Sequence, residues 1–388
     1  MIEYRSIMQS ELTYAKRLWA NCFTEDSDSF IQYYFKNCVP NDSFLGAFID
    51  NKLVSMLQIK EYLKMFRGKA IKTGYLTAVC TEEEYRMQGH AKKLIEKAFE
   101  VMKEKNIVIS SLYPFNYEFY EKFGYAICSD KQIITLNNAQ YPKITTNDIE
   151  IFKLEKDDAV TLSFELLKLY KEFMSRFEGY IIRDIELMKL TLLRHLENKN
   201  TDIIIARENG RIVGYSLNSL VGDSIIADEV VYKDIRAFAA ISKYLIGQAP
   251  SIKLTVPKED KMDTYFECKQ ENSELKPHIM HKVIDINQSL DIKELQDIKK
   301  PMILKITNIL DKNKFNIYSF SEQGIMEEND KKSWDIECTE NVYAQTVCGY
   351  IGFKEGIKNG LVKVQNNEQL TKFENIFKEN SLYVFEMF

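Results

Sequence analysis

The chain has 388 residues, of which 45% are hydrophobic and 28% are charged, and its formal net charge is -5. This length exceeds that of one compact core of ordinary size, so we expect two or three domains. The hydrophobic content excludes a chain that is disordered throughout. The acidic balance provides no overall basic field for a phosphate backbone, which disfavours nucleic acid as the main partner.

The cysteine and histidine patterns argue against a disulfide framework or a metal site. The seven cysteines are scattered and never spaced as C-x-x-C, which favours reduced thiols. His278 and His281 show an H-x-x-H spacing, but they lie in a strand-like run, where the two side chains would point to opposite faces. We therefore expect no metal. The charged start of the chain and the absence of ~20 consecutive apolar residues predict a cytoplasmic protein with no membrane partner.

The first part of the chain predicts helices followed by a β-α-β crossover. Two β-rich runs flank a pair of turn residues, which predicts a hairpin, and a third strand then leads through a glycine turn into an amphipathic helix and a fourth strand. The expected elements are helices within residues 12–38, strands at 44–48, 53–59 and 75–81, a helix at 89–105 and a strand at 107–112.

A second unit repeats part of this plan. Two β-rich runs again flank an Asn-Gly pair, and a further strand is followed by a helix-like segment. No glycine lies between Gly222 and Gly247, so the second copy keeps the scaffold but lacks the glycine turn. The expected elements are strands at 202–207, 211–217 and 225–231, a helix at 236–241, and a strand-like run at 278–286 that closes the unit.

The composition changes again after residue 290. Short β-like pieces at 302–306 and 314–318 alternate with polar loops, and a helix is expected at 369–377. The last seven residues, 382–388, are mostly apolar and aromatic. A solvated tail has no need of such residues, so we expect this segment to be docked on the protein.

The segment from Arg86 to Ala91 stands at the start of the helix expected at 89–105. A helix amino terminus presents unpaired backbone N–H groups and the positive end of the helix dipole, so it is suited to an anion such as a diphosphate. Gly89 leaves room for close approach, Ala91 keeps the first turn thin, and Arg86 supplies charge at the rim. On its own, this spacing is equally typical of an ordinary helix start.

The surrounding pattern makes this segment more specific. It follows a strand directly, and Phe119-Tyr120-Glu121-Lys122-Phe123-Gly124-Tyr125 lies beyond the next strand. Together these features resemble the GNAT acetyltransferase superfamily. The resemblance implies that acetyl-coenzyme A is the cosubstrate, with its pyrophosphate on the turn and its pantetheine along the preceding strand. The cofactor-binding residues implied are Val79, Cys80, Thr81, Arg86, Met87, Gln88, Gly89, His90, Ala91 and Asn116.

The whole chain resembles the enhanced-intracellular-survival (Eis-like) acetyltransferase family within that superfamily. The second unit without a glycine turn, the Lys276–Ile286 segment and the aromatic carboxy terminus carry this likeness. It implies an α+β protein: a catalytic GNAT domain at 1–148, a degenerate GNAT-like domain at 149–286, and a sterol-carrier-protein-like α/β domain at 287–388. It also implies a homo-oligomer, a hexamer. Met87 and Gln88 stand where family members often carry extra arginines, so the cofactor grip is expected to be less charged.

Acetyl transfer to an amine needs a proton for the leaving thiolate, and Tyr120 is the candidate acid. A phenol with a pKa near 10 keeps its proton at neutral pH and can donate it as charge develops on sulfur. The alternative is that Tyr120 only packs, like other aromatic residues of the chain. For the base, the Eis-like resemblance implies the terminal carboxylate of Phe388, which a frayed chain end would not provide.

The resemblance implies primary amines as acceptors, of the aminoglycoside, polyamine or lysine type. The acidic residues Glu25, Asp26, Asp28 and Glu386 are candidates for binding such a cation, although each alone is also typical of a solvated surface carboxylate. A different class of function remains open: a protein that binds a lipid or another apolar small ligand in the third domain, with a vestigial GNAT unit. The intact turn at Gly89 and the presence of Tyr120 disfavour it.

Overall fold

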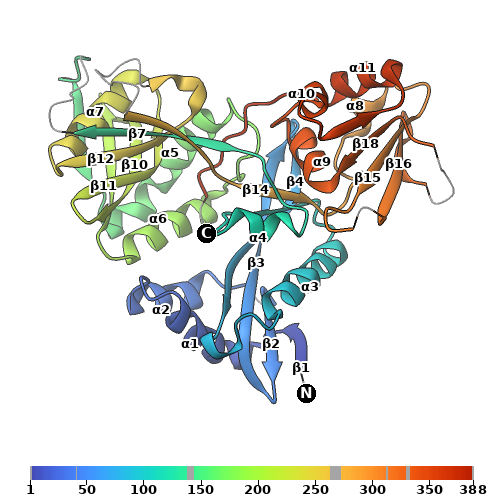
Figure 1. The fold of residues 1–388 in the computed structure, drawn as a ribbon. Helices are drawn as coiled ribbons and strands as arrows, with labels where there is room; N and C mark the ends of the chain where they lie inside the picture. Colours follow the sequence, from blue (N-terminus) through green and yellow to red (C-terminus); the bar gives the residue numbers. More distant parts are fainter. Residues whose placement is uncertain are drawn as a thin grey trace.

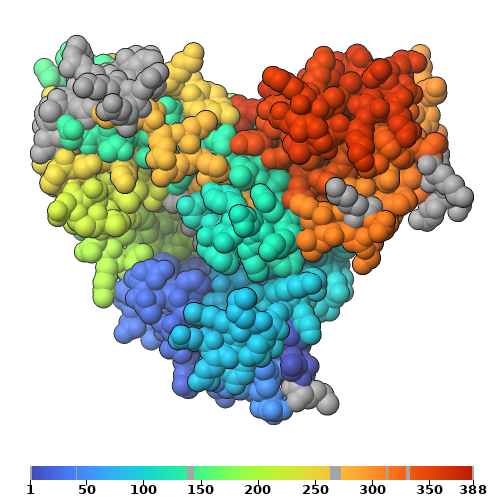
Figure 2. All heavy atoms as spheres, viewed as in Figure 1, coloured from blue at the N-terminus to red at the C-terminus, as the bar shows by residue number. Residues whose placement is uncertain are grey.

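In the part of the chain that the structure describes, the strands form three sheets, of seven, seven and five strands. The computed structural model describes residues 2–40, 42–137, 144–262, 272–311, 313–328 and 333–386. Each sheet carries its own helices, and we call the three groups the first, second and third units. They lie at three corners of the molecule (Figure 1), and in the space-filling view they form three lobes that meet near its centre (Figure 2).

The first unit has the sheet order β1-β2-β3-β4-β5-β14-β6. Its longest helix, α3, buries one apolar face through Leu94, Ile95, Ala98 and Met102, as the 3.6-residue period requires. The elements are β1 (Ile2–Ser6), η1 (Gln9–Glu11), α1 (Leu12–Cys22), α2 (Asp28–Asn37), β2 (Phe44–Ile49), β3 (Lys52–Phe66), β4 (Lys69–Thr81), η2 (Glu83–Tyr85), α3 (His90–Glu104), β5 (Ile109–Leu112), α4 (Tyr117–Glu121), β6 (Ala126–Ile127) and β14 (Met280–Val283).

The second unit has the sheet order β13-β7-β12-β11-β10-β9-β8. Helices α5 and α7 contribute many of its buried apolar residues, and α6 contacts α2 of the first unit. The elements are β7 (Asp130–Asn137), β8 (Ile149–Lys153), α5 (Lys156–Met174), α6 (Ile185–Glu197), β9 (Thr201–Glu208), β10 (Arg211–Val221), β11 (Ser224–Tyr232), α7 (Ile235–Ile246), β12 (Ser251–Val256), η3 (Lys258–Asp260) and β13 (Ser273–Pro277).

The third unit has the sheet order β17-β16-β15-β18-β19. Its core is rich in aromatic rings, with Phe320, Tyr343, Phe353 and Phe373 almost fully buried. The elements are α8 (Ile292–Leu295), β15 (Met302–Thr307), β16 (Phe315–Ser321), β17 (Gly324–Glu327), β18 (Ile336–Thr339), α9 (Glu340–Cys348), α10 (Phe353–Lys358), β19 (Val362–Val364) and α11 (Asn367–Ile376).

The first two units share one strand pattern. In the first, β2, β3 and β4 pair antiparallel and β4 then pairs parallel with β5. In the second, β9, β10 and β11 pair antiparallel and β11 then pairs parallel with β12. A helix, α3 or α7, makes each parallel crossover. The predicted α+β class with two related units followed by a third is therefore confirmed, while the likeness of the third to sterol carrier proteins stays a prediction.

The two sheets exchange strands. β7 follows the first unit in the chain but pairs with β12 and β13 in the second sheet. β14 lies within residues 278–286, the run expected to close the second unit, yet it pairs with β5 and β6 in the first sheet. That expectation is wrong because the edges of β5 and β6 offer backbone partners, and Ile279 and Met280 are fully buried there. The domain boundaries at 148/149 and 286/287 stay a prediction.

Residues 382–386 pack between the units, as expected for a docked segment. Tyr383 and Phe385 belong to the core of the second unit, and Val384 packs with Tyr75 and Ile279 of the first sheet. Among the described residues, no helix is both long and apolar enough to cross a bilayer.

Candidate functional site

β4 and β5 separate near the middle of the first sheet. They pair only from Thr73 to Tyr75 on β4, so the rest of that edge of β4 has no strand partner among the described residues. The pairing of β4 with β3 also shifts register, and Ala78 has a φ of +52°. Such a bulge bends a strand and re-aims its backbone groups. The end of β4 therefore has an edge without a strand partner, where the carbonyl oxygens of Cys80 and Thr81 already accept from Ser55 Oγ and Arg86 Nε.

Gly89 forms the N-cap of α3. Its φ is +82°, a left-handed conformation that disfavours other residues, and a Cβ placed on it would meet nothing within 4 Å. The helix start has no side-chain cap among the described residues, so its first backbone N–H groups are open. The start of α3 thus combines uncapped N–H donors, the positive end of the helix dipole and open space over Gly89. That it binds an anion stays a prediction.

A cavity of about 660 Å³ lies over this turn. We call it the turn cavity. It extends from the end of β4 to the start of α3, and four of its lining residues are aromatic. Its lining residues are Cys22, Phe23, Val79, Cys80, Thr81, Tyr85, Arg86, Met87, Gly89, His90, Ala91, Lys92, Phe115 and Phe119.

Not every predicted cofactor residue presents its side chain to the turn cavity. Arg86 Nε donates to the carbonyl oxygen of Thr81 at 3.2 Å, which fixes the turn against the end of β4. His90 is buried, and its Nδ1 lies 2.9 Å from Tyr4 Oη, so its contribution to an anion site would come from the backbone N–H. Burial also lowers the pKa of His90.

Gln88 and Asn116 use their side chains within the first unit. Gln88 Nε2 donates to the backbone carbonyl oxygen of Glu84 at 3.1 Å. Asn116 Oδ1 accepts from the backbone N–H of Phe119 at 2.9 Å and so caps α4. Met87 is fully exposed with a φ of +61°. Lys92, which was not among the predicted cofactor residues, lines the cavity one residue beyond Ala91 and adds a positive charge.

A second cavity, of about 440 Å³, lies between the first and second units. We call it the aromatic cavity, because seven of its lining residues are Phe, Tyr or Trp. It shares Phe23, Val79 and Phe115 with the turn cavity. The lining residues are Trp19, Phe23, Asp26, Phe30, Tyr34, Leu76, Thr77, Ala78, Val79, Tyr113, Phe115, Tyr120, Thr191, Arg194, His195, Asn198, Thr201, Leu217 and Ser219.

The sequence did not predict that residues of the second unit line the aromatic cavity. Thr191, Arg194 and His195 lie on α6, which packs near α2 of the first unit. Nothing in the local sequence of α6 indicates a site, because its role depends on how two distant segments of the chain pack together.

Tyr120 lies in α4 and lines the aromatic cavity. Its side chain is 3% exposed and sits among other rings, with its centroid 5.4 Å from that of Phe115 and 5.0 Å from that of Phe119. Its hydroxyl has no hydrogen-bond partner among the described residues. Burial raises the pKa of Tyr120, so the phenol keeps its proton at neutral pH. Both the packing and the chemical interpretation of Tyr120 fit this position.

The acidic residues predicted to bind the amine substrate lie in different environments. Asp26 lines the aromatic cavity, and its Oδ2 accepts from Trp19 Nε1 at 2.7 Å. Burial raises the pKa of Asp26. Glu25 and Asp28 are exposed. Asp28 lies in the first turn of α2, where a carboxylate interacts favourably with the positive end of the helix dipole.

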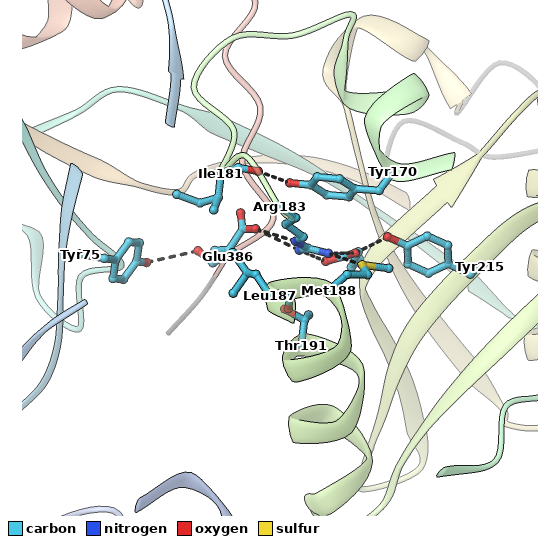
Figure 3. A network of polar contacts seen from close by, with 10 residues as sticks. Tyr75, Tyr170, Ile181, Arg183, Leu187, Met188, Thr191, Tyr215 and Glu386 are labelled. Atoms are coloured by element: carbon cyan, nitrogen blue, oxygen red, sulfur yellow. Dashed lines mark hydrogen bonds and ion pairs between the residues drawn. The ribbon is translucent and has the colours of Figure 1, made fainter. Parts of the chain in front are cut away.

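Glu386 lies in a buried ion-pair network (Figure 3). Arg183 contacts Glu229 through two hydrogen bonds of 2.7 and 2.6 Å and contacts Glu386 Oε1 at 3.0 Å. Tyr215 donates to Glu229 at 2.6 Å, and Tyr75 donates to the backbone carbonyl oxygen of Glu386 at 3.2 Å. Glu386 is 7% exposed, and burial raises its pKa. The structure therefore places this carboxylate in an interior network rather than on a substrate surface.

Phe388, the candidate for the base, lies outside the described residues, so its role stays a prediction. No group of three or more metal-ligating side chains gathers anywhere in the described parts of the chain.

Comparisons with known proteins agree with this geometry. Residues 3–128 match a family described as an acetyltransferase (GNAT) domain. No curated protein sequence matches the chain.

Solved structures share the fold over the full length. A conserved protein of unknown function from Enterococcus faecalis is 16% identical, with a TM-score of 0.81 and 100% of both chains covered. A GCN5-related N-acetyltransferase from Anabaena variabilis is 15% identical, with a TM-score of 0.77 and 100% of both chains covered. Eis1 from Mycobacterium abscessus is 13% identical, with a TM-score of 0.72 and 100% of both chains covered. Residues 3–128 are therefore similar to GNAT acetyltransferase domains, a class of domain that uses acetyl-coenzyme A, and the likeness of the whole chain to the solved structures is one of fold.

Proposed function

We propose that the protein is an acetyl-coenzyme A-dependent N-acetyltransferase that transfers the acetyl group directly to a primary amine. One observation carries this proposal: the turn cavity and the aromatic cavity share Phe23, Val79 and Phe115. A ligand anchored over Gly89 and a second ligand in the aromatic cavity would meet at this common wall. Direct transfer needs such a meeting point, because both reactants must be held together.

The chain's own residues would bind acetyl-coenzyme A, which supplies the acetyl group as a thioester. The backbone N–H groups at the start of α3 would hold the pyrophosphate, and Lys92 would add charge. The unpaired edge of β4 from Val79 to Thr81 would hydrogen-bond the pantetheine. These roles follow from the open helix start and from the separation of β4 and β5.

In the transfer step the amine nitrogen forms a bond to the acetyl carbon, and the carbon–sulfur bond breaks. The sulfur then needs a proton, and the amine nitrogen must lose one. We assign the first proton to the Tyr120 hydroxyl, because burial keeps this phenol protonated and it lines the aromatic cavity. A base must accept the proton that the amine loses. Its assignment to the terminal carboxylate of Phe388 stays a prediction.

Little favours the alternative of an apolar-ligand carrier. The core of the third unit buries Phe320, Tyr343, Phe353 and Phe373 almost fully, and the cavity of about 370 Å³ beside it has charged as well as apolar lining residues. A carrier would need space in that core.

A thiol-release assay with acetyl-coenzyme A and a panel of primary amines tests the proposal. We expect thiol release that depends on the amine, with an acetylated amine detected by mass spectrometry. Tight binding of acetyl-coenzyme A without turnover on any amine would contradict the proposed activity and favour a binding role.

A further inference from the structure

Charged side chains are sparse on the wall of the aromatic cavity. Among the lining residues that the structure describes, Asp26 is the one carboxylate and Arg194 the one guanidinium. Burial lowers the pKa of His195, whose Nε2 lies near the backbone carbonyl oxygens of Asp202 and Asn218, so this imidazole is neutral near pH 7. The formal charges on the described wall therefore cancel.

Asp26 is held in place with one oxygen available. Trp19 Nε1 donates to Oδ2 at 2.7 Å, and the backbone N–H of Asp26 donates to the carbonyl oxygen of Phe23 at 3.2 Å. Within the described residues, Oδ1 has no hydrogen-bond partner. A carboxylate fixed through one oxygen can accept from an ammonium group through the other without a large loss of side-chain entropy.

Aromatic rings line the same cavity as this carboxylate. The ring of Trp19 lies 5.3 Å from that of Phe23 and 4.8 Å from that of Tyr34, and Phe30 lies 5.8 Å from Tyr34. Ring faces attract a cation, and ring surfaces stabilise an apolar or aromatic ligand body by removing it from water. They provide no acceptor for a second or third ammonium group, and burying such a group without a partner is costly.

We propose that the aromatic cavity selects acceptors with a single ammonium group on an aromatic body, the arylalkylamine class, and that Asp26 binds the ammonium. The cavity would disfavour polycations such as aminoglycosides, which need several carboxylates. This inference rests on the proposed acetyltransferase function and narrows its acceptor.

The first experiment compares acceptors with the full-length protein. Thiol release is measured with acetyl-coenzyme A and four amines: tryptamine, 2-phenylethylamine, n-hexylamine and kanamycin. We expect kcat/KM for the two aromatic amines to exceed that for n-hexylamine by about tenfold, which corresponds to one or two ring contacts. Kanamycin is expected to be the poorest acceptor.

The second experiment tests the carboxylate. Asp26→Asn keeps the shape of the side chain and its acceptor for Trp19 but removes the charge, so KM for tryptamine is expected to rise at least about tenfold. The affinity for acetyl-coenzyme A, measured by calorimetry, should stay unchanged. Asp157→Asn is the matched control, because Asp157 is exposed in the first turn of α5 and lines neither cavity, and it should leave both values unchanged.

The outcomes separate this inference from the function on which it rests. Preferred acetylation of kanamycin, or an unchanged KM in Asp26→Asn, overturns the arylalkylamine assignment while the acetyltransferase proposal stands. A failure to acetylate any of the four amines contradicts both the proposed acetyltransferase activity on primary amines and the arylalkylamine assignment.

Discussion

The helix starts of α3 and α7 occupy corresponding positions in the first two units, yet they are built differently. α3 begins at Gly89 with no side-chain cap among the described residues. α7 begins at Asp234, whose Oδ1 accepts from the backbone N–H groups of Arg236 and Ala237 at 2.9 and 3.0 Å. The N–H groups that α3 leaves open to a ligand are thus partly satisfied within the protein in α7.

The strands that precede these two helices, β4 and β11, show a similar difference between the units. Both β4 and β11 carry a register shift beside the parallel crossover. In the first unit the region beyond it lines two cavities. In the second unit, Glu229 on β11 is held by Arg183, and Tyr383 packs into the core with its hydroxyl 3.5 Å from the carbonyl oxygen of Thr255 on β12. The same scaffold therefore borders two cavities in the first unit and a buried ion-pair network in the second.

The largest effect is expected from breaking the buried ion-pair network around Arg183. Arg183→Met leaves the carboxylates of Glu229 and Glu386 buried without their counter-charge, so the free energy of unfolding should fall by about 3–5 kcal/mol. Urea denaturation measures it. The control is Arg176→Met in the same unit, because the Arg176–Asp260 pair is partly exposed and should contribute less than about 1 kcal/mol. Equal losses of unfolding free energy in the two variants would show that the buried network stabilises the protein no more than the partly exposed ion pair does.

The next effect concerns chemistry that only the first unit offers. Tyr120→Phe removes the proposed acid, so kcat should fall by about 100-fold while the affinity for acetyl-coenzyme A stays the same. Because burial raises the pKa of Tyr120, its ionisation should cause no loss of rate below about pH 10 in the unmodified protein. Stopped-flow thiol release over a pH series measures both. An unchanged kcat would leave Tyr120 as a packing residue only.

A third change makes the first helix start resemble the second. Gly89→Asp places a carboxylate beside the open N–H groups and forces a non-glycine residue into a positive φ. The negative charge would compete with the pyrophosphate, so the affinity for acetyl-coenzyme A should fall about 30-fold, or about 2 kcal/mol. Calorimetry measures the dissociation constant. Wild-type affinity in this variant would remove the turn from the binding site.

The smallest effect is expected from the reverse change. Asp234→Ala removes the cap of α7, so the free energy of unfolding should fall by about 1 kcal/mol. The kcat and KM for any accepted amine should not change. A loss of activity at unchanged stability would mean that the start of α7 takes part in catalysis and does not serve only to cap the helix.

Local patterns in the sequence were sufficient to predict most of the first unit. The hairpin of β2 and β3, the crossover through α3 and the glycine turn all follow from short-range periodicity and from Gly89. The missing glycine in the second unit also predicted that it lacks an anion site of this kind.

Features that depend on distant segments could not be predicted in this way. The burial of Glu386 depends on Arg183, more than two hundred residues away in the chain, and α6 forms part of the aromatic cavity only because it packs near α2. The placement of β14 in the first sheet likewise depends on an edge left open by β5 and β6. Short-range patterns carry no information on such pairings.

The exchange of β7 and β14 has a consequence for dissecting this protein into parts. The matched acetyltransferase segment ends at residue 128, but its sheet is completed by β14 from residues 280–283. A fragment cut at the end of that segment would expose the backbone edge of β5 and remove Ile279 and Met280 from the interior. The matched amino-terminal segment is therefore not expected to fold as a separate domain, and the two fragments of a chain cut there would have to reassociate through pairing of β14 with β5 to restore the first sheet.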